Sequence, residues 1–197
     1  MKYRAITSEN FYYTDIKRTA KIVMGKRYSR EELIEIIKEK GIIEYNTEYN
    51  FNKKFLSINK RINKLNEFLI IKLAEESPDI GKFINLFSIV LNERIFYDFF
   101  NEVIKEKYFL LDYYITNDEF ISFMNEKEEQ EEEIKNWSSE TKRKIIVKIK
   151  AFLVESGYLV KTETGYKIIR PLIPDDIISN IEQNYDKNIL RILLQMQ

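Results

Sequence analysis

The chain has 197 residues, of which 44% are hydrophobic, and its 32 Lys and Arg balance its 32 Asp and Glu. Because the chain contains neither Cys nor His, disulfide scaffolds, thiolate zinc sites, Cys nucleophiles and Ser-His-Asp triads are excluded. The length suits one large domain or two small domains packed together, and the scarcity of Pro (three) and Gly (five) disfavours disorder and loop-rich β architectures.

The order of apolar and charged residues argues against a membrane protein. Residues Met1–Arg4 are not followed by an apolar run, as a signal peptide would require. The most apolar window, Phe83–Phe100, is interrupted by four polar side chains, those of Asn92, Glu93, Arg94 and Asp98. Since no stretch reaches the roughly 18 apolar residues of a membrane span, we expect a cytoplasmic protein that makes no membrane contact.

Charge is distributed unevenly along the chain. Residues 1–75 hold 16 basic and 10 acidic side chains, whereas residues 76–197 hold 16 and 22. Such segregation predicts surfaces that have different partners.

The first 75 residues are expected to form a helical unit. Apolar residues at helical spacing predict a first helix over Tyr13–Met24. The capping box Ser29–Glu32 starts a second helix, which continues to Lys40 and is ended by the left-handed residue Gly41. A third helix, predicted over Phe51–Leu65, has one buried apolar stripe. A helix, a short polar connection and a second helix are the layout of a helix-turn-helix.

The middle of the chain, residues 76–115, is expected to form an aromatic helical core. Apolar residues are dense at helical spacing from Pro78, which suits the first turn of a helix, to Phe109. We predict two helices that break near Asn92. Aromatic residues in such a pattern are far more often core than part of a ligand site.

Residues 116–197 are expected to resemble a winged helix. A second capping box, Thr116–Glu119, begins a helix that runs into the acidic stretch Glu126–Glu133, which we interpret as a solvated helix end and not as a metal site. Ser138 and Ser139 precede a basic helix over residues 140–155.

Two short strands, at residues 158–161 and 166–169, should follow as a hairpin. Two short helices, at residues 175–183 and 188–196, should finish the chain. The expected fold is therefore mainly α, with a helical core, a helix-turn-helix-like N-terminal part and a winged-helix-like C-terminal part that holds one short β-hairpin, all packed as one compact unit.

The helix predicted over Phe51–Leu65 has a basic face opposite its apolar stripe. The segment contains no acidic residue, although solvated helices normally mix charges because opposite charges at i, i+4 stabilise them. Phosphate contact explains such a face, and a lysine-rich surface in a lysine-rich protein is the alternative. The candidate DNA-binding residues here are Lys53, Lys54, Lys60, Arg61 and Lys64.

A second basic segment spans residues 138–170, with eight Lys or Arg and three Glu. In a winged helix the basic helix enters the major groove, and the hairpin contacts the backbone or the minor groove. Winged helices also bind proteins, so the fold alone does not decide between these partners. The candidate DNA-binding residues here are Lys142, Arg143, Lys144, Lys148 and Lys167.

The sequence contains no catalytic signature. A glycine-rich phosphate loop, a nucleophile elbow and paired carboxylates at metal spacing are all lacking. Asp175 and Asp176 follow Pro174 and suit a helix N-terminus. We therefore expect a protein that is not an enzyme, with no catalytic residue, no metal and no cofactor.

Several stretches resemble the BrxA family of BREX phage-defence systems. The stretches are Phe99–Tyr108, Ile115–Phe120, Trp137–Lys144 and Leu153–Leu159, with looser agreement at Arg18–Gly25, Tyr28–Glu32 and Lys60–Leu65. The resemblance implies a small helical, non-enzymatic component of a prokaryotic defence system that binds DNA through helix-turn-helix or winged-helix elements. The balanced net charge departs from that of a typical DNA-binding protein.

The leading hypothesis is binding of double-stranded DNA through its phosphates, with little sequence preference. One alternative is an adaptor that contacts other BREX proteins through the acidic stretch and the C-terminal helices. RNA binding is a weaker alternative, because no stacking motif of the common RNA modules is present. Replacement of Lys60, Arg61 and Lys64 together by Glu is expected to abolish DNA binding without unfolding the protein.

Overall fold

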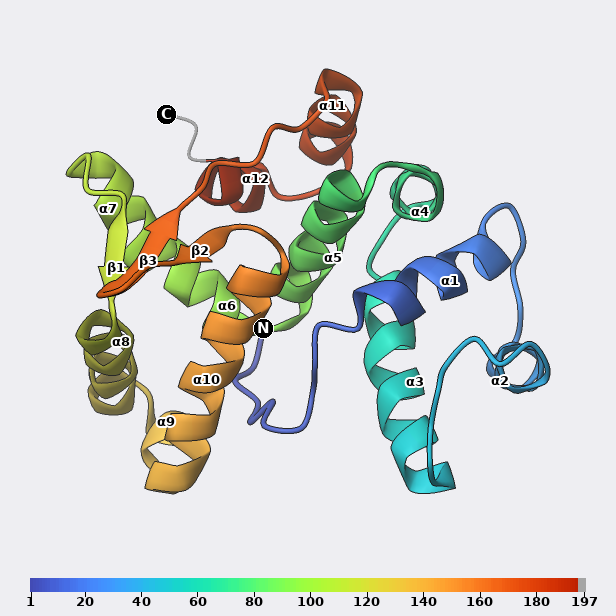
Figure 1. The fold of residues 1–197 in the computed structure, drawn as a ribbon, viewed down its shortest axis with the longest axis horizontal. Coiled ribbons are helices and arrows are strands. Elements are labelled where there is room, and N and C mark those ends of the chain that lie inside the picture. Colours follow the sequence, from blue (N-terminus) through green and yellow to red (C-terminus); the bar gives the residue numbers. More distant parts are fainter. Residues whose placement is uncertain (195–197) are drawn as a thin grey trace.

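The computed structural model describes residues 1–194. Helices dominate it, and one small sheet lies at one end (Figure 1), which confirms the mainly α fold class. In chain order the elements are α1 (Tyr13–Val23), α2 (Arg30–Glu39), α3 (Glu48–Ile62), α4 (Glu67–Glu75), α5 (Pro78–Asn92), α6 (Arg94–Phe99), the π-helical turn η1 (Phe100–Ile104), α7 (Lys105–Phe109), β1 (Tyr114–Thr116), α8 (Asn117–Gln130), α9 (Glu132–Lys135), α10 (Ser139–Glu155), β2 (Leu159–Lys161), β3 (Gly165–Ile168), α11 (Asp175–Asn184) and α12 (Lys187–Leu194).

The N-terminal helices begin at the residues that cap them. The Ser29 hydroxyl accepts from the backbone N–H of Glu32, and the Glu32 carboxylate accepts from the backbone N–H of Ser29, so the predicted capping box starts α2. Thr47 caps α3 in the same region, which starts that helix three residues earlier than predicted. Asn66 caps α4, a helix that has no counterpart among the predicted elements.

The central helices form the most deeply buried layer. Every residue from Phe83 to Val90 is buried, as expected for an aromatic core. α5 ends at Asn92 because the backbone of Glu93 is extended, with φ −121° and ψ 106°, and α6 starts at the next residue. The predicted break near Asn92 is confirmed.

The three strands form an antiparallel sheet in the order β1-β3-β2. β2 and β3 are the predicted hairpin, in which Val160 lies opposite Lys167. β1 was not predicted, because three residues are too few to show the alternation that marks a strand. It pairs with β3 so that Ile115 lies opposite Tyr166. β1, which precedes α8, is thus the third strand of a sheet whose other two strands, β2 and β3, follow α10.

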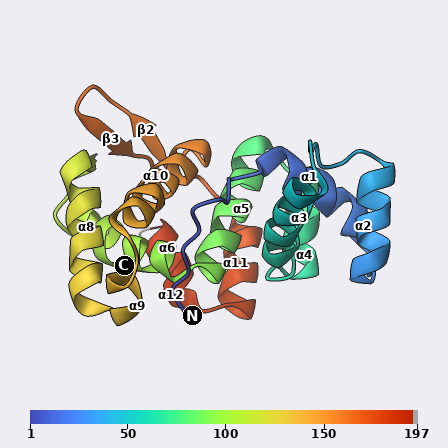
Figure 2. The ribbon, with the colours of Figure 1, turned by 90° about the horizontal axis from the view of Figure 1, so that it is seen from below.

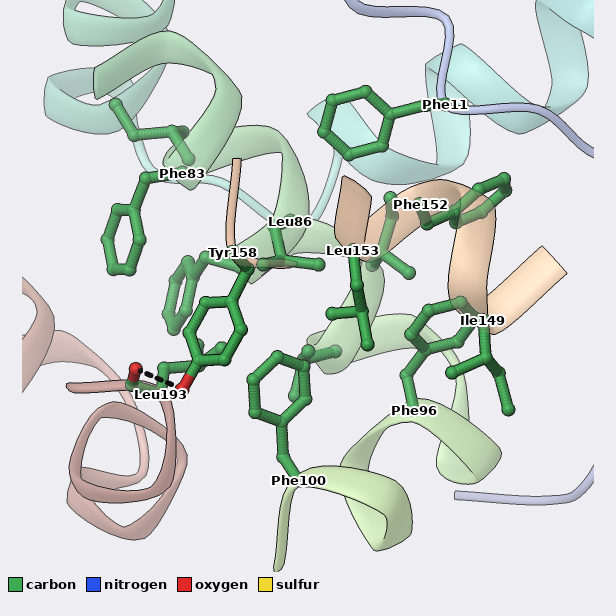
Figure 3. Packing of buried hydrophobic residues seen from close by; sticks show 14 of the residues in the cluster. Phe11, Phe83, Leu86, Phe96, Phe100, Ile149, Phe152, Leu153, Tyr158 and Leu193 are labelled. Carbon is green, nitrogen blue, oxygen red and sulfur yellow. Dashed lines mark hydrogen bonds between the residues drawn. The ribbon is translucent and has the colours of Figure 1, made fainter. Parts of the chain in front are cut away.

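One hydrophobic cluster connects the elements (Figure 3). Phe152 of α10 stacks on Phe96 of α6, with ring centroids 5.4 Å apart, and also meets Phe11, whose ring centroid is 6.0 Å away. The hydroxyl of Tyr158, just after α10, donates to the carbonyl oxygen of Leu193 in α12 at 3.1 Å. Because α10 contacts the central layer and residues near both ends of the chain, its orientation is fixed by packing.

Residues 1–12, here called the N-terminal strap, cross the molecule between α10 and the N-terminal helices (Figure 2). The Tyr3 hydroxyl donates to Asp98 at 2.5 Å, and Arg4 pairs with Glu93 at 2.5 Å. Further along the strap, the ring of Phe11 reaches α10. The strap therefore contacts both the central layer and the C-terminal part.

The C-terminal helices agree with the prediction over the part of the chain that the structure describes. α11 and α12 occupy the predicted regions, and the predicted end of the last helix at Met196 lies outside the described residues. Buried side chains from residues 1–75, 76–115 and 116–194 all join the same cluster, and the division at these boundaries stays a prediction. No helix within residues 1–194 is both long enough and apolar enough to cross a bilayer.

The approach of β1 to β3 requires glycine at position 165. A Cβ on Gly165 would overlap the carbonyl oxygen of Ile115 and lie 3.2 Å from its carbonyl carbon. We expect Gly165→Ala to lower the free energy of unfolding by about 1–3 kcal/mol, the usual cost of overpacking, as measured by urea denaturation. Thr164→Ala, at the neighbouring exposed position, is the control. Equal stability of both variants would contradict this account of the sheet.

Candidate nucleic-acid interface

α10 is a helix with one buried and one exposed side. Its N-terminus is capped by the Ser138 hydroxyl, which accepts from the backbone N–H of Thr141 at 3.1 Å. Four apolar side chains anchor the helix in the core: Ile145, Ile149, Phe152 and Leu153. The anchoring holds the opposite side at the molecular surface, where the β2–β3 hairpin projects beside the helix (Figure 2).

The exposed side of α10 and the hairpin carry cations. Arg143 and Lys167 are exposed and have no carboxylate partner among residues 1–194. Lys144 pairs with Glu140 one turn earlier at 2.6 Å, and both side chains are at least half exposed. Such surface pairs contribute little free energy, so the Lys144 ammonium remains accessible to an anion. These three side chains are where the sequence predicted them.

Two other predicted contacts of this segment are engaged within the chain. The Lys142 ammonium is 2.7 Å from Glu128, and its side chain is only 13% exposed. Lys148 donates to the side-chain oxygen of Asn10 in the strap at 2.6 Å. Both lysines therefore hold α10 to its neighbours.

Lys150, which is not among the candidate residues, fixes α10 against the sheet. Its Nζ lies 4.8 Å from the ring centroid of Phe120 and 5.9 Å from that of Tyr166, and it donates to Asn117 Oδ1 at 2.7 Å. Burial lowers the pKa of Lys150, and the nearby Asp118 opposes that shift. The residue stabilises the contact of α10 with α8 and β3.

The N-terminal candidates on α3 differ widely in exposure. Lys53 and Lys64 are exposed, and the Lys53 ammonium lies 4.5 Å from the ring centroid of Tyr49. Lys54 donates to the carbonyl oxygen of Glu44 at 2.8 Å and lies 3.6 Å from the carboxylate of Asp15. α3 ends at Ile62, three residues earlier than predicted, so Lys64 lies just after it. Lys53 of α3 and Lys64 are thus the accessible cations of this segment.

Arg61 does not lie on the outer face of α3, which corrects the prediction. Its side chain is 3% exposed. The guanidinium donates to the carbonyl oxygens of Phe11 at 2.7 Å and Asn10 at 2.8 Å, and lies 3.4 Å from the Glu9 carboxylate. Burial lowers the pKa of Arg61, an effect that Glu9 opposes. Arg61 holds the strap and is not available to DNA.

Lys60 is also engaged, because it forms an ion pair with the buried carboxylate of Glu93, which pairs with Arg4 as well. The triple replacement of Lys60, Arg61 and Lys64 by Glu is therefore not a neutral probe of DNA binding. At position 61 it would bury a carboxylate beside Glu9, which destabilises the fold. The acceptors come from a segment about 50 residues earlier, so the periodicity of α3 alone could not reveal them.

Two exposed cations near the end of α3 were not predicted. Lys26 and Arg27, in the connection between α1 and α2, line a surface cavity of about 710 Å³ together with Asn59 and Asn63 of the last turn of α3. They are far from α3 in sequence, and only the packing of α1 and α2 brings them there. They add positive charge to the end of α3 where Lys64 lies.

The acidic stretch is partly neutralised by basic side chains from other elements. Glu128 pairs with Lys142, and Glu131 accepts from Arg94 at 2.9 Å. Within residues 1–194, no three acidic side chains converge where they could share a metal ion. The accessible chemistry of the surface is therefore charge attraction and hydrogen-bond donation by Lys and Arg.

Known proteins with a similar sequence or fold agree with this architecture. A sequence profile described as BrxA matches residues 1–185. The chain belongs to the BrxA family. A relative of this BrxA-family protein, the BREX protein BrxA of Bacillus cereus (strain H3081.97), is 28% identical over 189 residues, which are 96% of this chain and 94% of the relative. The family resemblance noted in the sequence is confirmed.

The fold also occurs in a crystal structure of an uncharacterized protein from Magnetospirillum magneticum. The two chains superpose with a TM-score of 0.81 over 98% of each chain, at 13% sequence identity. The whole arrangement of helices, strands and strap in the BrxA-family chain thus has a counterpart in a solved structure.

The contact between Arg61 and the strap can be tested by stability. Arg61→Met removes the side-chain donor to the Asn10 carbonyl oxygen. It also removes one of two donors to the Phe11 carbonyl oxygen, which Asn85 binds as well, and one donor to the Glu9 carboxylate, which Ser57 binds as well. We therefore expect the free energy of unfolding to fall by about 3 kcal/mol, as measured by urea denaturation followed by circular dichroism. Lys64→Met, at an exposed position just after the same helix, should change it by less than about 0.5 kcal/mol. If Arg61→Met were as stable as the wild type, the buried guanidinium would not be what anchors the strap.

Proposed function

We propose that this BrxA-family protein is a non-enzymatic component of a BREX phage-defence system that binds double-stranded DNA. The observation that carries the proposal is the exposed basic side of α10 beside a projecting hairpin. This pairing of a surface helix and a hairpin offers two elements that can engage one duplex at adjacent positions.

The topology supports the proposal. The order of a helix, β1, the α8 helix, α10 and the β2–β3 hairpin, with strands arranged β1-β3-β2, resembles that of a winged helix, in which the third helix enters the major groove. α10 would be that helix and β2–β3 the wing. The short α9 is an addition between the second and third helices.

The placement of charge also supports the proposal. Arg143, Lys144 and Lys167 are exposed, whereas Glu128 and Glu131 of the acidic stretch are paired with Lys142 and Arg94. DNA binding depends on the local density of cations, because each contact with a phosphate releases condensed counterions. A chain with no net charge can therefore bind DNA through one basic surface.

The end of α3 is proposed as a secondary contact. Lys53, Lys64, Lys26 and Arg27 are exposed and basic and can contact phosphates beyond the site of α10. Lys54, Lys60 and Arg61 are assigned to the fold because their polar groups already have partners within the chain.

Charge reversal on α10 and the wing tests the proposal. In Arg143→Glu/Lys144→Glu/Lys167→Glu we expect affinity for a labelled duplex of about 30 base pairs to fall roughly 100-fold, because three phosphate contacts at roughly 1 kcal/mol each are lost. Fluorescence anisotropy over a salt series should also show a shallower dependence on salt, by about one unit of slope per contact.

The matched control reverses three exposed lysines on other elements, Lys21, Lys40 and Lys105, and should retain most of the affinity. Wild-type affinity in the α10 and wing variant would exclude that surface. A wild-type protein that does not bind the duplex even at low salt would overturn the DNA-binding function, and tighter binding to a single-stranded RNA of equal length would favour the RNA alternative.

A second candidate function, contact with another BREX protein, is favoured by an exposed apolar turn after α7. Phe109, Leu110 and Leu111 are 87%, 62% and 74% exposed, and adjacent exposed apolar residues of this kind mark interaction sites. The C-terminal helix α12 does not serve this purpose, because its apolar side chains, Ile189, Leu190, Ile192, Leu193 and Leu194, are buried.

Replacement of the apolar turn should separate the two functions. We expect Phe109→Ser/Leu110→Ser/Leu111→Ser to bind duplex DNA like the wild type and to lose co-purifying BREX proteins from cells that express the complete system, after nuclease treatment and a high-salt wash. Leu172→Ser, at a single apolar residue that is 92% exposed, is the control. Unchanged co-purification would remove the turn as a protein contact.

A further inference from the structure

The exposed side of α10 has an apolar centre between its basic residues. Val147 and Val154 are 53% and 38% exposed, and they stand two turns apart, about 10 Å along the helix axis. Arg143 and its neighbour Lys144 lie about one turn before Val147. The half-buried Ala151 lies between the two valines.

Solvation alone does not account for these valines. β-Branched side chains lower helix stability slightly relative to Lys, Glu or Gln, which are otherwise abundant on exposed helix positions. Their methyl groups remain in contact with water unless a partner covers them. The flanking Arg143 and Lys144 require that this partner be anionic at its edges, and Lys is depleted from the apolar centres of protein–protein interfaces.

The major groove of DNA offers both an apolar group for the valines and anionic edges for Arg143 and Lys144. Phosphates line its edges, and the only apolar group on its floor is the C5-methyl of thymine. Between Lys142 and Val154, α10 contains no Asn, Gln, Ser or Thr, the residues that most often read adenine or accept bonds from several bases. Apart from Arg143 and Lys144, which can bind guanine, the side chains by which this helix can distinguish base pairs are those that contact methyl groups.

We propose that Val147 and Val154 of α10 contact thymine methyl groups in the major groove, so that A·T-rich duplexes are the preferred DNA ligand. This inference rests on the proposed DNA-binding function. Phosphate contacts alone are expected to give little sequence preference, and the valines would add recognition of bases.

Replacement of thymine by uracil tests the inference, because it removes the methyl group and keeps the base pairing. Affinities for a labelled A·T-rich duplex of about 30 base pairs and for its uracil counterpart are measured by fluorescence anisotropy in the same salt. For wild-type protein we expect the uracil duplex to bind more weakly, by about fourfold for each methyl contact, which corresponds to the transfer free energy of one methyl-sized apolar group.

In Val147→Ala/Val154→Ala the preference for thymine should be weaker than in the wild type, because alanine lacks the γ-methyl groups that reach farthest towards the bases. Val160→Ala is the matched control. This valine is 50% exposed but lies on β2 of the wing, which contacts the backbone or the minor groove, where no thymine methyl is presented, so the preference for thymine should persist.

The outcomes are distinguishable. Wild-type protein that binds both duplexes with equal affinity would overturn the inference and leave DNA binding in place. A preference for thymine that is as strong in Val147→Ala/Val154→Ala as in the wild type would also overturn it, because the methyl contact would then lie elsewhere. Failure of wild-type protein to bind either duplex would overturn the proposed function together with the inference.

Discussion

The buried guanidinium of Arg61 is the interaction on which the arrangement of the molecule depends. It binds the backbone of the strap at Phe11 and Asn10, and the same two residues then contact α10, through the ring of Phe152 and the ammonium of Lys148. A single buried cation thus sets α3 and α10 at a fixed relation through a segment that has no regular structure of its own. The carbonyl oxygens of Asn10 and Phe11 have no ladder partners, so side-chain donors satisfy them. The Arg61 guanidinium binds both oxygens, and Asn85 of α5 also binds that of Phe11.

The elements that were predicted correctly are those with strong local signals. The capping boxes at Ser29 and Thr116 start helices in the structure, and the hairpin of β2 and β3 forms around its predicted turn. β1 and the strap were not predicted, since a three-residue strand and a segment without periodicity are defined by partners distant in sequence. The same limit explains Arg61, because an arginine that binds a distant backbone looks in sequence like an arginine on a solvated face.

The candidate interface shows how charge is divided between fold and surface. Lys60 and Lys142 neutralise carboxylates at or near buried positions, so they form part of the support that orients α10 and α3. Arg143 and Lys144 lie on the exposed side of α10, which these ion pairs do not cover. A chain with balanced charge can keep one basic face, because the attraction of a charged ligand depends on the local arrangement of charges and not on the net charge alone.

The strap has a consequence for the order in which the protein can fold during synthesis. Its residues are synthesised well before those of α10, yet Asn10 contacts Lys148, 138 positions later in the chain. Arg61 emerges only 50 residues after Phe11, so α3 can hold the strap while the ring of Phe11 still lacks its partner on α10. The ring of Phe11 can meet Phe152 only after α10 has been translated, so this contact joins the two ends of the fold late in synthesis.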